Sequence, residues 1–290
     1  MGNSATCTCG STPQTPVKQR LVADTGPLLD GLDSWDFHAL DYDNEQLGIA
    51  CLLLLQALFT KCGGKNQDAL PCFICCVRDG HLPNPYHNFA HAVDVLQTIL
   101  RLGTLMPWDA VLDPLVRFAV LVAGLAHDIG HPGISNVFLI DAGYEIAHRY
   151  NDLSPLENMH CSRLFEIVGM EHCAIFGHLP RREFLALRRL MTDAILRTDA
   201  LRHGEVLAEL QAFLKVYADV FDGQKTGGGA LSLAQLDVLR TEEGRRMLSR
   251  VLVLGADESN QAKPWRSAYA WAELLREEMI AQGDRERSIG

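Results

Sequence analysis

The sequence has little positive charge and no long apolar segment. Its 290 residues carry 26 Lys and Arg against 36 Asp and Glu, a net charge of -10. Nucleic-acid binders cluster cations on one face, so this balance argues against a nucleic-acid partner. No apolar run is long enough to cross a membrane, and no signal peptide begins the chain. We therefore expect a globular protein of the cytoplasm.

The cysteines lack the spacing of a zinc finger. Cys72, Cys75 and Cys76 lie close together, but no second Cys or His pair follows them at the separation that such sites use. Without a secretion signal, reduced thiols are favoured over disulfides. We interpret these three residues as buried cysteines of a helix.

Strand-like alternation bounded by hairpin turns is absent, and apolar residues recur with helical spacing instead. We expect an all-α fold, a single compact multi-helix domain over residues 34–290, after a mobile leader over residues 1–33 that is rich in Ser, Thr, Pro and Gly. A glycine-rich loop is expected over residues 222–229. The predicted helices cover residues 44–59, 92–105, 112–125, 155–168, 182–197, 205–221, 231–254 and 265–282.

The first residues match the pattern for N-myristoylation. Gly2 is the acceptor, and Cys7 and Cys9 lie where a second acyl chain could attach. One myristoyl chain binds membranes only marginally, so peripheral membrane attachment would need these cysteines. A chance match in a disordered tail is the alternative.

Histidines and carboxylates are concentrated in two motifs. His87 and His91 are four residues apart, which places both imidazoles on one face if both lie in a helix. His127, Asp128 and His131 follow an apolar helix that ends just before them. A histidine pair alone is more often a hydrogen-bonded feature than a metal site.

Asp257 ends a further apolar segment, and taken alone it is better explained as an ordinary helix cap than as a metal ligand. Together, His91, His127, Asp128 and Asp257 follow the order His, His-Asp, Asp of two-metal phosphohydrolases of the HD superfamily. Such a set can hold one cation while leaving coordination positions for water, and Asp128 can bridge to a second cation.

The motifs around these residues resemble class I 3′,5′-cyclic nucleotide phosphodiesterases. The resemblance rests on Tyr86-His87-Asn88, on His127-Asp128-Ile129-Gly130-His131-Pro132-Gly133 and on residues 91–95, 150–152, 156–158, 198–199, 256–260 and 282–286. It runs in family order from about residue 35 to the end of the chain.

This resemblance implies a metal-dependent enzyme that hydrolyses cyclic AMP, cyclic GMP or both to the 5′-monophosphate, by in-line attack of a hydroxide that bridges two metals. His91, His127, Asp128 and Asp257 would ligate a tightly held Zn²⁺, and Asp128 would also reach Mg²⁺ or Mn²⁺ at a second site. His131 would act on the metals through a water.

The same resemblance assigns the remaining site residues. His87 is expected to be the general acid for the departing ribose oxygen, and Glu157 is expected to pair with His87 and keep it protonated. Thr198 and Asp199 are expected to support the site from behind its metal ligands. The substrate pocket is expected to include Tyr86, His87, Asp128, Asp257 and Asn260.

The chain departs from the family pattern at two places. The family carries a glutamine and an aromatic clamp for the purine in a later helix, so the last helices are expected to be missing from this chain. Glu258 stands where relatives have an apolar residue. A weak or inactive binding protein and a hydrolase of other phosphoesters therefore stay open, as do the choice between cyclic AMP and cyclic GMP and a homodimer.

Overall fold

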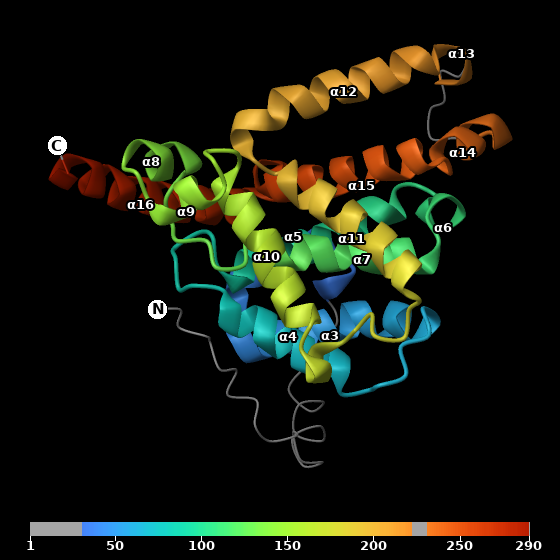
Figure 1. The fold of residues 1–290 in the computed structure, drawn as a ribbon, viewed down its shortest axis with the longest axis horizontal. Helices are drawn as coiled ribbons and strands as arrows, with labels where there is room; N and C mark the ends of the chain where they lie inside the picture. Colours follow the sequence, from blue (N-terminus) through green and yellow to red (C-terminus); the bar gives the residue numbers. More distant parts are fainter. Residues whose placement is uncertain (1–30, 222–230, 290) are drawn as a thin grey trace.

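The computed structural model describes residues 31–221 and 231–289, and every regular element within those ranges is helical (Figure 1). The all-α expectation is therefore confirmed. The α-helices are α3 (Asn44–Lys61), α4 (Ala69–Gly80), α5 (Phe89–Thr104), α6 (Trp108–Val111), α7 (Pro114–Ala126), α8 (Asn136–Asp141), α9 (Glu145–Arg149), α10 (Pro155–Val168), α11 (Arg181–Leu196), α12 (His203–Val216), α13 (Ala218–Phe221), α14 (Leu233–Leu239), α15 (Glu242–Asp257) and α16 (Trp265–Ile289). Short 3₁₀-helices are η1 (Ala39–Asp41), η2 (Glu171–Cys173), η3 (Ala200–Arg202) and η4 (Glu258–Ala262).

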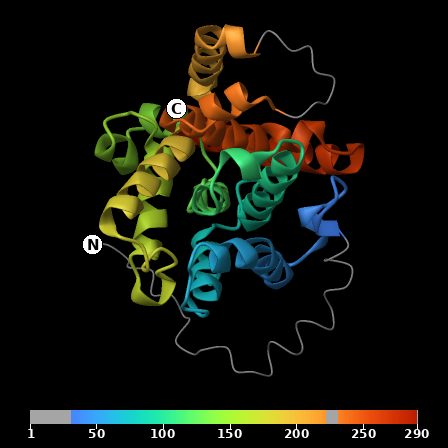
Figure 2. The same cartoon turned by 90° about the vertical axis from the view of Figure 1, so that its right-hand side faces the viewer.

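Helix α7 is the centre of the core. Every residue from Val116 to Ala126 is buried, because α3, α5, α11 and α15 pack around it (Figures 1 and 2). The helix begins where Asp113 Oδ1 accepts hydrogen bonds from the N–H groups of Leu115 and Val116, both at 3.0 Å, with Pro114 in the first turn. An apolar helix capped in this way can be buried along its whole length.

Several predicted helices differ from those of the structure in where they begin or end. The segment expected as one helix over residues 231–254 is divided, because Thr241 Oγ1 accepts a hydrogen bond from Gly244 N–H and starts α15. Gly244 lies so close to the preceding turn that a Cβ there would be 2.4 Å from the Val238 oxygen. The cap and this close approach set the break, which apolar spacing does not show.

The three clustered cysteines do lie in a helix, α4, as expected. Cys76 is buried, whereas Cys72 and Cys75 are half-buried.

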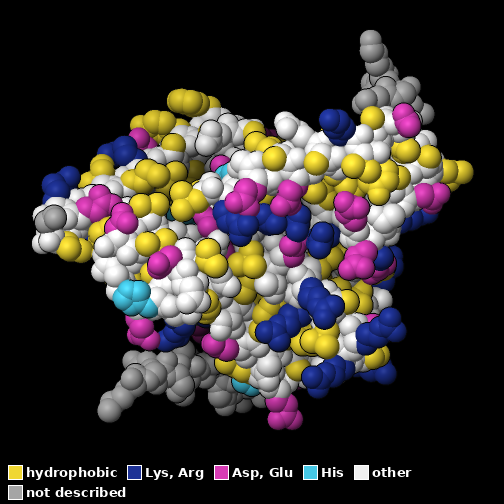
Figure 3. Space-filling model, turned by 45° about the horizontal axis from the view of Figure 1, so that its top comes forward, with side chains coloured by type: hydrophobic (Ala, Val, Ile, Leu, Met, Phe, Trp, Pro, Cys, Tyr) yellow, Lys and Arg dark blue, Asp and Glu magenta, His cyan; other side chains and the backbone are white. Residues whose placement is uncertain are grey.

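Two other expectations fall outside the described residues: the acylation motif of Gly2, Cys7 and Cys9, and the glycine-rich loop over residues 222–229. None of the described helices is both long and apolar enough to span a bilayer. On the face drawn in Figure 3, positive and negative side chains are interspersed across the middle of the surface, in line with the mixed charge of the sequence.

The helix ends bring the predicted site residues together. His91 is in the first turn of α5, His127 directly follows α7, and Asp257 is the last residue of α15. Since α5, α7 and α15 pack against one another, these three ends meet on one side of the core. Helix α16 then crosses this side of the molecule (Figure 1).

Candidate metal centre and pocket

Four side chains converge at these helix ends, and we call His91, His127, Asp128 and Asp257 the donor cluster. One ligand atom from each lies within 4.8 Å of the other three. Asp257 Oδ1 is 3.1 Å from His91 Nε2 and 3.3 Å from His127 Nε2. Asp128 Oδ2 is 3.1 Å from His127 Nε2 and 3.5 Å from His91 Nε2. The tertiary structure therefore brings together the four predicted ligands.

The chemistry of the donor cluster fits a cation such as zinc. His127 Nδ1 donates to the Gly124 carbonyl at 2.8 Å, which directs Nε2 and its lone pair toward the carboxylates. His91 and His127 are fully buried, and two carboxylates in such a place need a positive counter-charge. Two imidazole nitrogens and two carboxylate oxygens form a mixed set that Zn²⁺ accepts.

The two oxygens of Asp128 face different neighbours. Oδ2 faces the imidazoles of the donor cluster, whereas Oδ1 lies 3.7 Å from His160 Nε2. His160 Nδ1 in turn donates to the Ile129 carbonyl at 2.9 Å. Asp128 thus has one oxygen for the donor cluster and one for an adjacent position, which is the arrangement that a carboxylate shared by two cations requires.

His160 was not identified from the sequence. It lies three residues after Glu157 on α10, so the two side chains point to the same side of that helix. That spacing was the only available signal.

Charges within the donor cluster shift its proton affinities strongly. Burial lowers the pKa of His127, but Asp128 and Asp257 outweigh burial and hold that pKa well above its usual range. Burial raises the pKa of Asp128, and His127 reverses this and holds it well below its usual range. A cation that binds here must therefore displace a proton from His127.

His87 lies beside the donor cluster and is held by α16. Glu278 Oε1 pairs with His87 Nδ1, and Glu278 Oε2 accepts the backbone N–H groups of Tyr86 at 2.9 Å and His87 at 3.1 Å. Burial lowers the pKa of His87, but the hydrogen bond to Glu278 and the nearby negative charges raise it above its ordinary value. His87 is thereby favoured as a protonated imidazole.

The pairing expected between Glu157 and His87 is corrected by the structure. Glu157 Oε2 accepts a hydrogen bond from Asn136 Nδ2 at 2.9 Å, and Glu278 is the carboxylate at His87. Burial and the charge of Asp199 raise the pKa of Glu157 to about 7. Sequence proximity could not identify Glu278, because it is 191 residues from His87.

His87 and His91 also do not share a helix. Helix α5 starts at Phe89, and Asn88 caps it by accepting the His91 N–H group at 3.1 Å. His87 therefore lies in the preceding loop, where its ring stacks on that of His131 with centroids 3.9 Å apart. Asn84 Nδ2 joins the two loops by donating to the carbonyls of His87 at 2.8 Å and His131 at 2.6 Å.

Thr198 and Asp199 line the same pocket as Glu157 and are held by their own hydrogen bonds. Asp199 Oδ2 accepts from the Ser154 hydroxyl at 2.7 Å, and Thr198 Oγ1 donates to the Ile195 carbonyl at 2.8 Å. Ser154 has a left-handed φ of 43°, a conformation that costs free energy and that this buried hydrogen bond helps to hold. The strained turn sets the start of α10 and so the position of Glu157.

Tyr86 and Asn260 are linked directly, because Asn260 Nδ2 donates to the Tyr86 hydroxyl at 2.6 Å.

Glu258 directs Oε1 toward His203 Nδ1 at 3.5 Å, and its side chain is 53% exposed. About half of this extra carboxylate side chain is therefore exposed to solvent, at the border of the pocket.

Most of the predicted site residues border one pocket of about 500 Å³. Its walls combine the polar side chains with an apolar side from the turn before α8 and from α16, which includes Ile134, Trp271 and Met279. His91 and His127 lie beneath its floor, fully buried. The predicted site residues that line it are Tyr86, His87, Asp128, His131, Glu157, Thr198, Asp199, Asp257 and Asn260. A pocket of this size is in the range that takes a mononucleotide-sized ligand.

Comparisons with known proteins bear on the family and the fold of this chain. The family model described as 3′5′-cyclic nucleotide phosphodiesterase matches residues 86–290. The mouse (Mus musculus) high affinity cGMP-specific 3′,5′-cyclic phosphodiesterase 9A is 33% identical over 225 residues, 78% of this chain. The Drosophila melanogaster dual specificity calcium/calmodulin-dependent 3′,5′-cyclic nucleotide phosphodiesterase 1 is 34% identical over 277 residues, 92% of this chain.

Among solved structures, the phosphodiesterase domain of the RhoPDE fusion protein from the choanoflagellate Salpingoeca rosetta superposes with a TM-score of 0.79 at 30% identity. The match covers 89% of this chain and 77% of that domain. The chain spans only 38% of the mouse protein and 30% of the Drosophila protein.

Proposed function

Because this chain belongs to the 3′,5′-cyclic nucleotide phosphodiesterase family, we propose that it hydrolyses a 3′,5′-cyclic nucleotide to the 5′-monophosphate. The observation that carries this proposal is the pairing of His87 with Glu278 at the edge of the donor cluster, inside one pocket. In the reaction, a water oxygen bonds to phosphorus, the bond between phosphorus and the ribose 3′ oxygen breaks, and that oxygen gains a proton.

The donor cluster would hold one divalent cation, with Zn²⁺ as the proposed ion. Asp128 Oδ1, on the side of His160 and Glu157, would contribute to a second site for Mg²⁺ or Mn²⁺. Two such cations would stabilise the charge of the phosphate and supply a water acidic enough to attack phosphorus near neutral pH.

His87 is the proposed proton donor to the 3′ oxygen. Glu278 binds its Nδ1, which leaves Nε2 for the substrate, and raises the population of the protonated ring. The Asn84 hydrogen bonds hold the loops of His87 and His131 together. This preorganised loop fixes the donor before substrate enters.

Tyr86, Asn260 and the apolar wall of α16 are proposed to bind the nucleoside part of the substrate. The relatives named above are cGMP-specific and dual specificity enzymes, so cyclic GMP and cyclic AMP are both proposed substrates. His131, Thr198 and Asp199 are proposed to support the cations and Glu157 from behind.

The test is turnover of cyclic AMP and cyclic GMP by the full chain with Zn²⁺ and Mg²⁺, with the product identified chromatographically. His87→Ala should lower kcat by about 10²–10⁴-fold, the usual contribution of a general acid, and leave bound zinc unchanged. His148→Ala, an exposed histidine outside the pocket, is the matched control.

Stoichiometric nucleotide binding without product would reject the proposal and favour a binding protein. Turnover confined to other phosphoesters would favour the broader hydrolase function.

We also propose a cytoplasmic location, membrane attachment through acylated Gly2 with Cys7 or Cys9, and a homodimer. Incorporation of labelled myristate by the wild type, but not by Gly2→Ala, tests the first acylation step. Sedimentation of the purified chain tests the dimer.

A further inference from the structure

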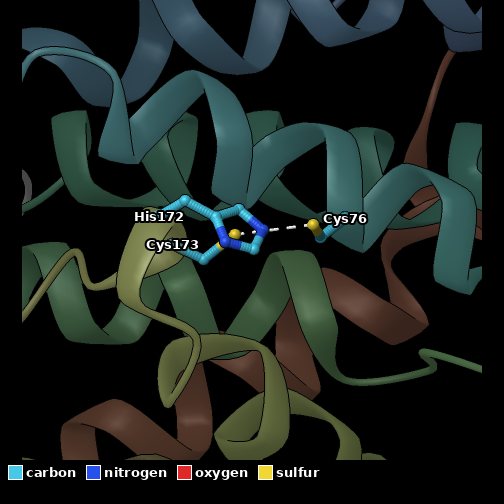
Figure 4. Close-up of side chains that lie close together, drawn as sticks. All are labelled: Cys76, His172 and Cys173. Atoms are coloured by element: carbon cyan, nitrogen blue, oxygen red, sulfur yellow. Dashed lines mark hydrogen bonds between the residues drawn. The ribbon is translucent and has the colours of Figure 1, made fainter. Parts of the chain in front are cut away.

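A second set of metal-binding side chains lies outside the pocket. Cys76 is on α4, and His172 and Cys173 are consecutive residues of η2, which packs on α4 (Figure 4). One ligand atom from each of these three residues lies within 4.8 Å of the other two. We call Cys76, His172 and Cys173 the thiol cluster. None of its residues borders the pocket described above.

The two sulfur atoms are already close to the spacing that zinc imposes. Cys173 Sγ donates a hydrogen bond to Cys76 Sγ at 3.4 Å. A tetrahedral Zn²⁺ with bonds to sulfur of about 2.3 Å separates two ligand sulfurs by about 3.8 Å. The thiols would thus move apart by a few tenths of an ångström, a shift that side-chain rotation supplies.

The charge balance also favours a divalent cation. Binding converts two thiols to thiolates and releases two protons, so two thiolates, a neutral imidazole and Zn²⁺ form a set with no net charge. Cys76 is 6% exposed and Cys173 is fully buried. A neutral set can be accommodated at such buried positions, whereas two uncompensated thiolates cannot.

His172 supplies the outer side of the thiol cluster. Its side chain is exposed while the sulfurs are inside, so an ion can reach the sulfurs past the imidazole. Figure 4 shows the His172 ring beside the two sulfur atoms, between η2 and α4. With three protein ligands, the fourth zinc position would be taken by water.

The backbone holds Cys173 in place. Its N–H group donates to the Met170 carbonyl at 2.9 Å, and its carbonyl accepts from Ile175 N–H at 2.7 Å. Cys76 is fixed by its position within α4. The ligands therefore need little reorganisation to bind an ion, which favours affinity.

We propose that Cys76, His172 and Cys173 form a zinc site, separate from the catalytic centre, that ties η2 to α4. Helix α4 leads into the loop of Tyr86 and His87, and η2 joins α10 to α11. A bound ion would brace these two segments against each other, with the two sulfurs inside and His172 at the surface.

The test uses Co²⁺ as a spectroscopic substitute for Zn²⁺ in the reduced 290-residue chain under oxygen-free conditions. Thiolate ligation to Co²⁺ gives an intense near-ultraviolet charge-transfer band, which the donor cluster cannot produce because it contains no sulfur. We expect this band in the wild type, its loss in Cys76→Ala, and its weakening in His172→Ala together with loss of one bound zinc.

Two matched variants serve as controls. Cys161→Ala removes a thiol that is 7% exposed, close to the 6% of Cys76, and His148→Ala removes an exposed histidine. Both should keep the band and the full zinc content. His172→Ala is at an exposed position, so its result does not depend on tolerance of a core substitution.

Three results would overturn the proposal: the absence of a charge-transfer band in the wild type, a band that Cys76→Ala leaves unchanged, or zinc content unaffected by His172→Ala. A disulfide between Cys76 and Cys173 in peptide mapping, with no cobalt band after reduction, would also overturn it.

Discussion

Glu278 binds His87 through both of its carboxylate oxygens: Oε2 accepts a hydrogen bond from the backbone N–H of His87 at 3.1 Å, and Oε1 pairs with Nδ1 of the His87 ring. A single carboxylate on α16 thus fixes both the position of the loop and the orientation of the imidazole. It also makes the proposed proton donor dependent on how α16 packs.

Glu278→Gln keeps a hydrogen-bonding side chain but removes the negative charge, so the pKa of His87 should fall. Activity that needs protonated His87 declines as pH rises through this pKa, and the variant should show that decline at lower pH. Above both pKa values, kcat should fall about tenfold for each pKa unit lost.

The measurement is the pH profile of kcat. Glu277→Gln, a change at the exposed neighbouring residue, is the control and should have the same pH profile as the wild type. If the pH profile of Glu278→Gln is not shifted, Glu278 does not control the protonation of His87.

Metal binding at the donor cluster should depend on pH. The raised pKa of His127 means that a proton competes with the cation, so zinc affinity should decrease as pH falls. Calorimetric titration in buffers of different ionisation enthalpy should show net proton release on zinc binding. Asp257→Asn should weaken that binding, whereas Asp141→Asn, at an exposed carboxylate outside the pocket, should not.

Glu157 should make the stability of the metal-free protein decrease with rising pH. Its pKa is about 7 in the fold against 4.5 normally, so the folded state retains a proton that the unfolded chain releases. The free energy of unfolding begins to decrease near pH 4.5, the ordinary pKa, and the loss is complete above pH 7, where it is on the order of 3 kcal/mol.

Glu157→Gln should therefore be more stable than the wild type at pH 8 and similar to it near pH 4.5. Urea unfolding at both pH values measures the difference. Glu166→Gln, an exposed change on the same helix, should show no such trend; equal wild-type and Glu157→Gln stability at pH 8 would contradict the assignment.

Lys263 and Asp94 form a buried ion pair with Nζ 2.6 Å from Oδ2. This pair joins the segment just before α16 to α5, so it anchors the helix that carries Glu278. Lys263→Met leaves the Asp94 carboxylate buried without its partner and should cost about 3–5 kcal/mol of unfolding free energy.

The double variant Lys263→Met with Asp94→Leu should recover most of that loss, because no charge stays buried. Arg266→Met, which breaks an exposed pair with Asp41, should cost at most about 1 kcal/mol. Denaturant unfolding of the wild type, Lys263→Met, the double variant and Arg266→Met measures these differences. If Lys263→Met is as stable as the wild type, the ion pair does not stabilise the fold in this way.

The amino-acid sequence by itself determined the all-α class, most of the longer helical segments and the four residues of the donor cluster. Helical periodicity is a local property, and His91, His127, Asp128 and Asp257 occur in a characteristic order beside apolar helices. The ends of the helices were harder to predict from the sequence. Caps such as Thr241 depend on side-chain hydrogen bonds to the backbone, which compete with continuation of the helix.

Only the tertiary structure decided which distant groups meet. Glu278 reaches His87 across 191 residues, and Cys173 reaches Cys76 across 97. Neither pair has a spacing that a local pattern can express, since each depends on the packing of one helix against another. The sequence identified the four residues of the donor cluster, whereas the packing of α16 brought Glu278 to His87 and the packing of η2 brought Cys173 to Cys76.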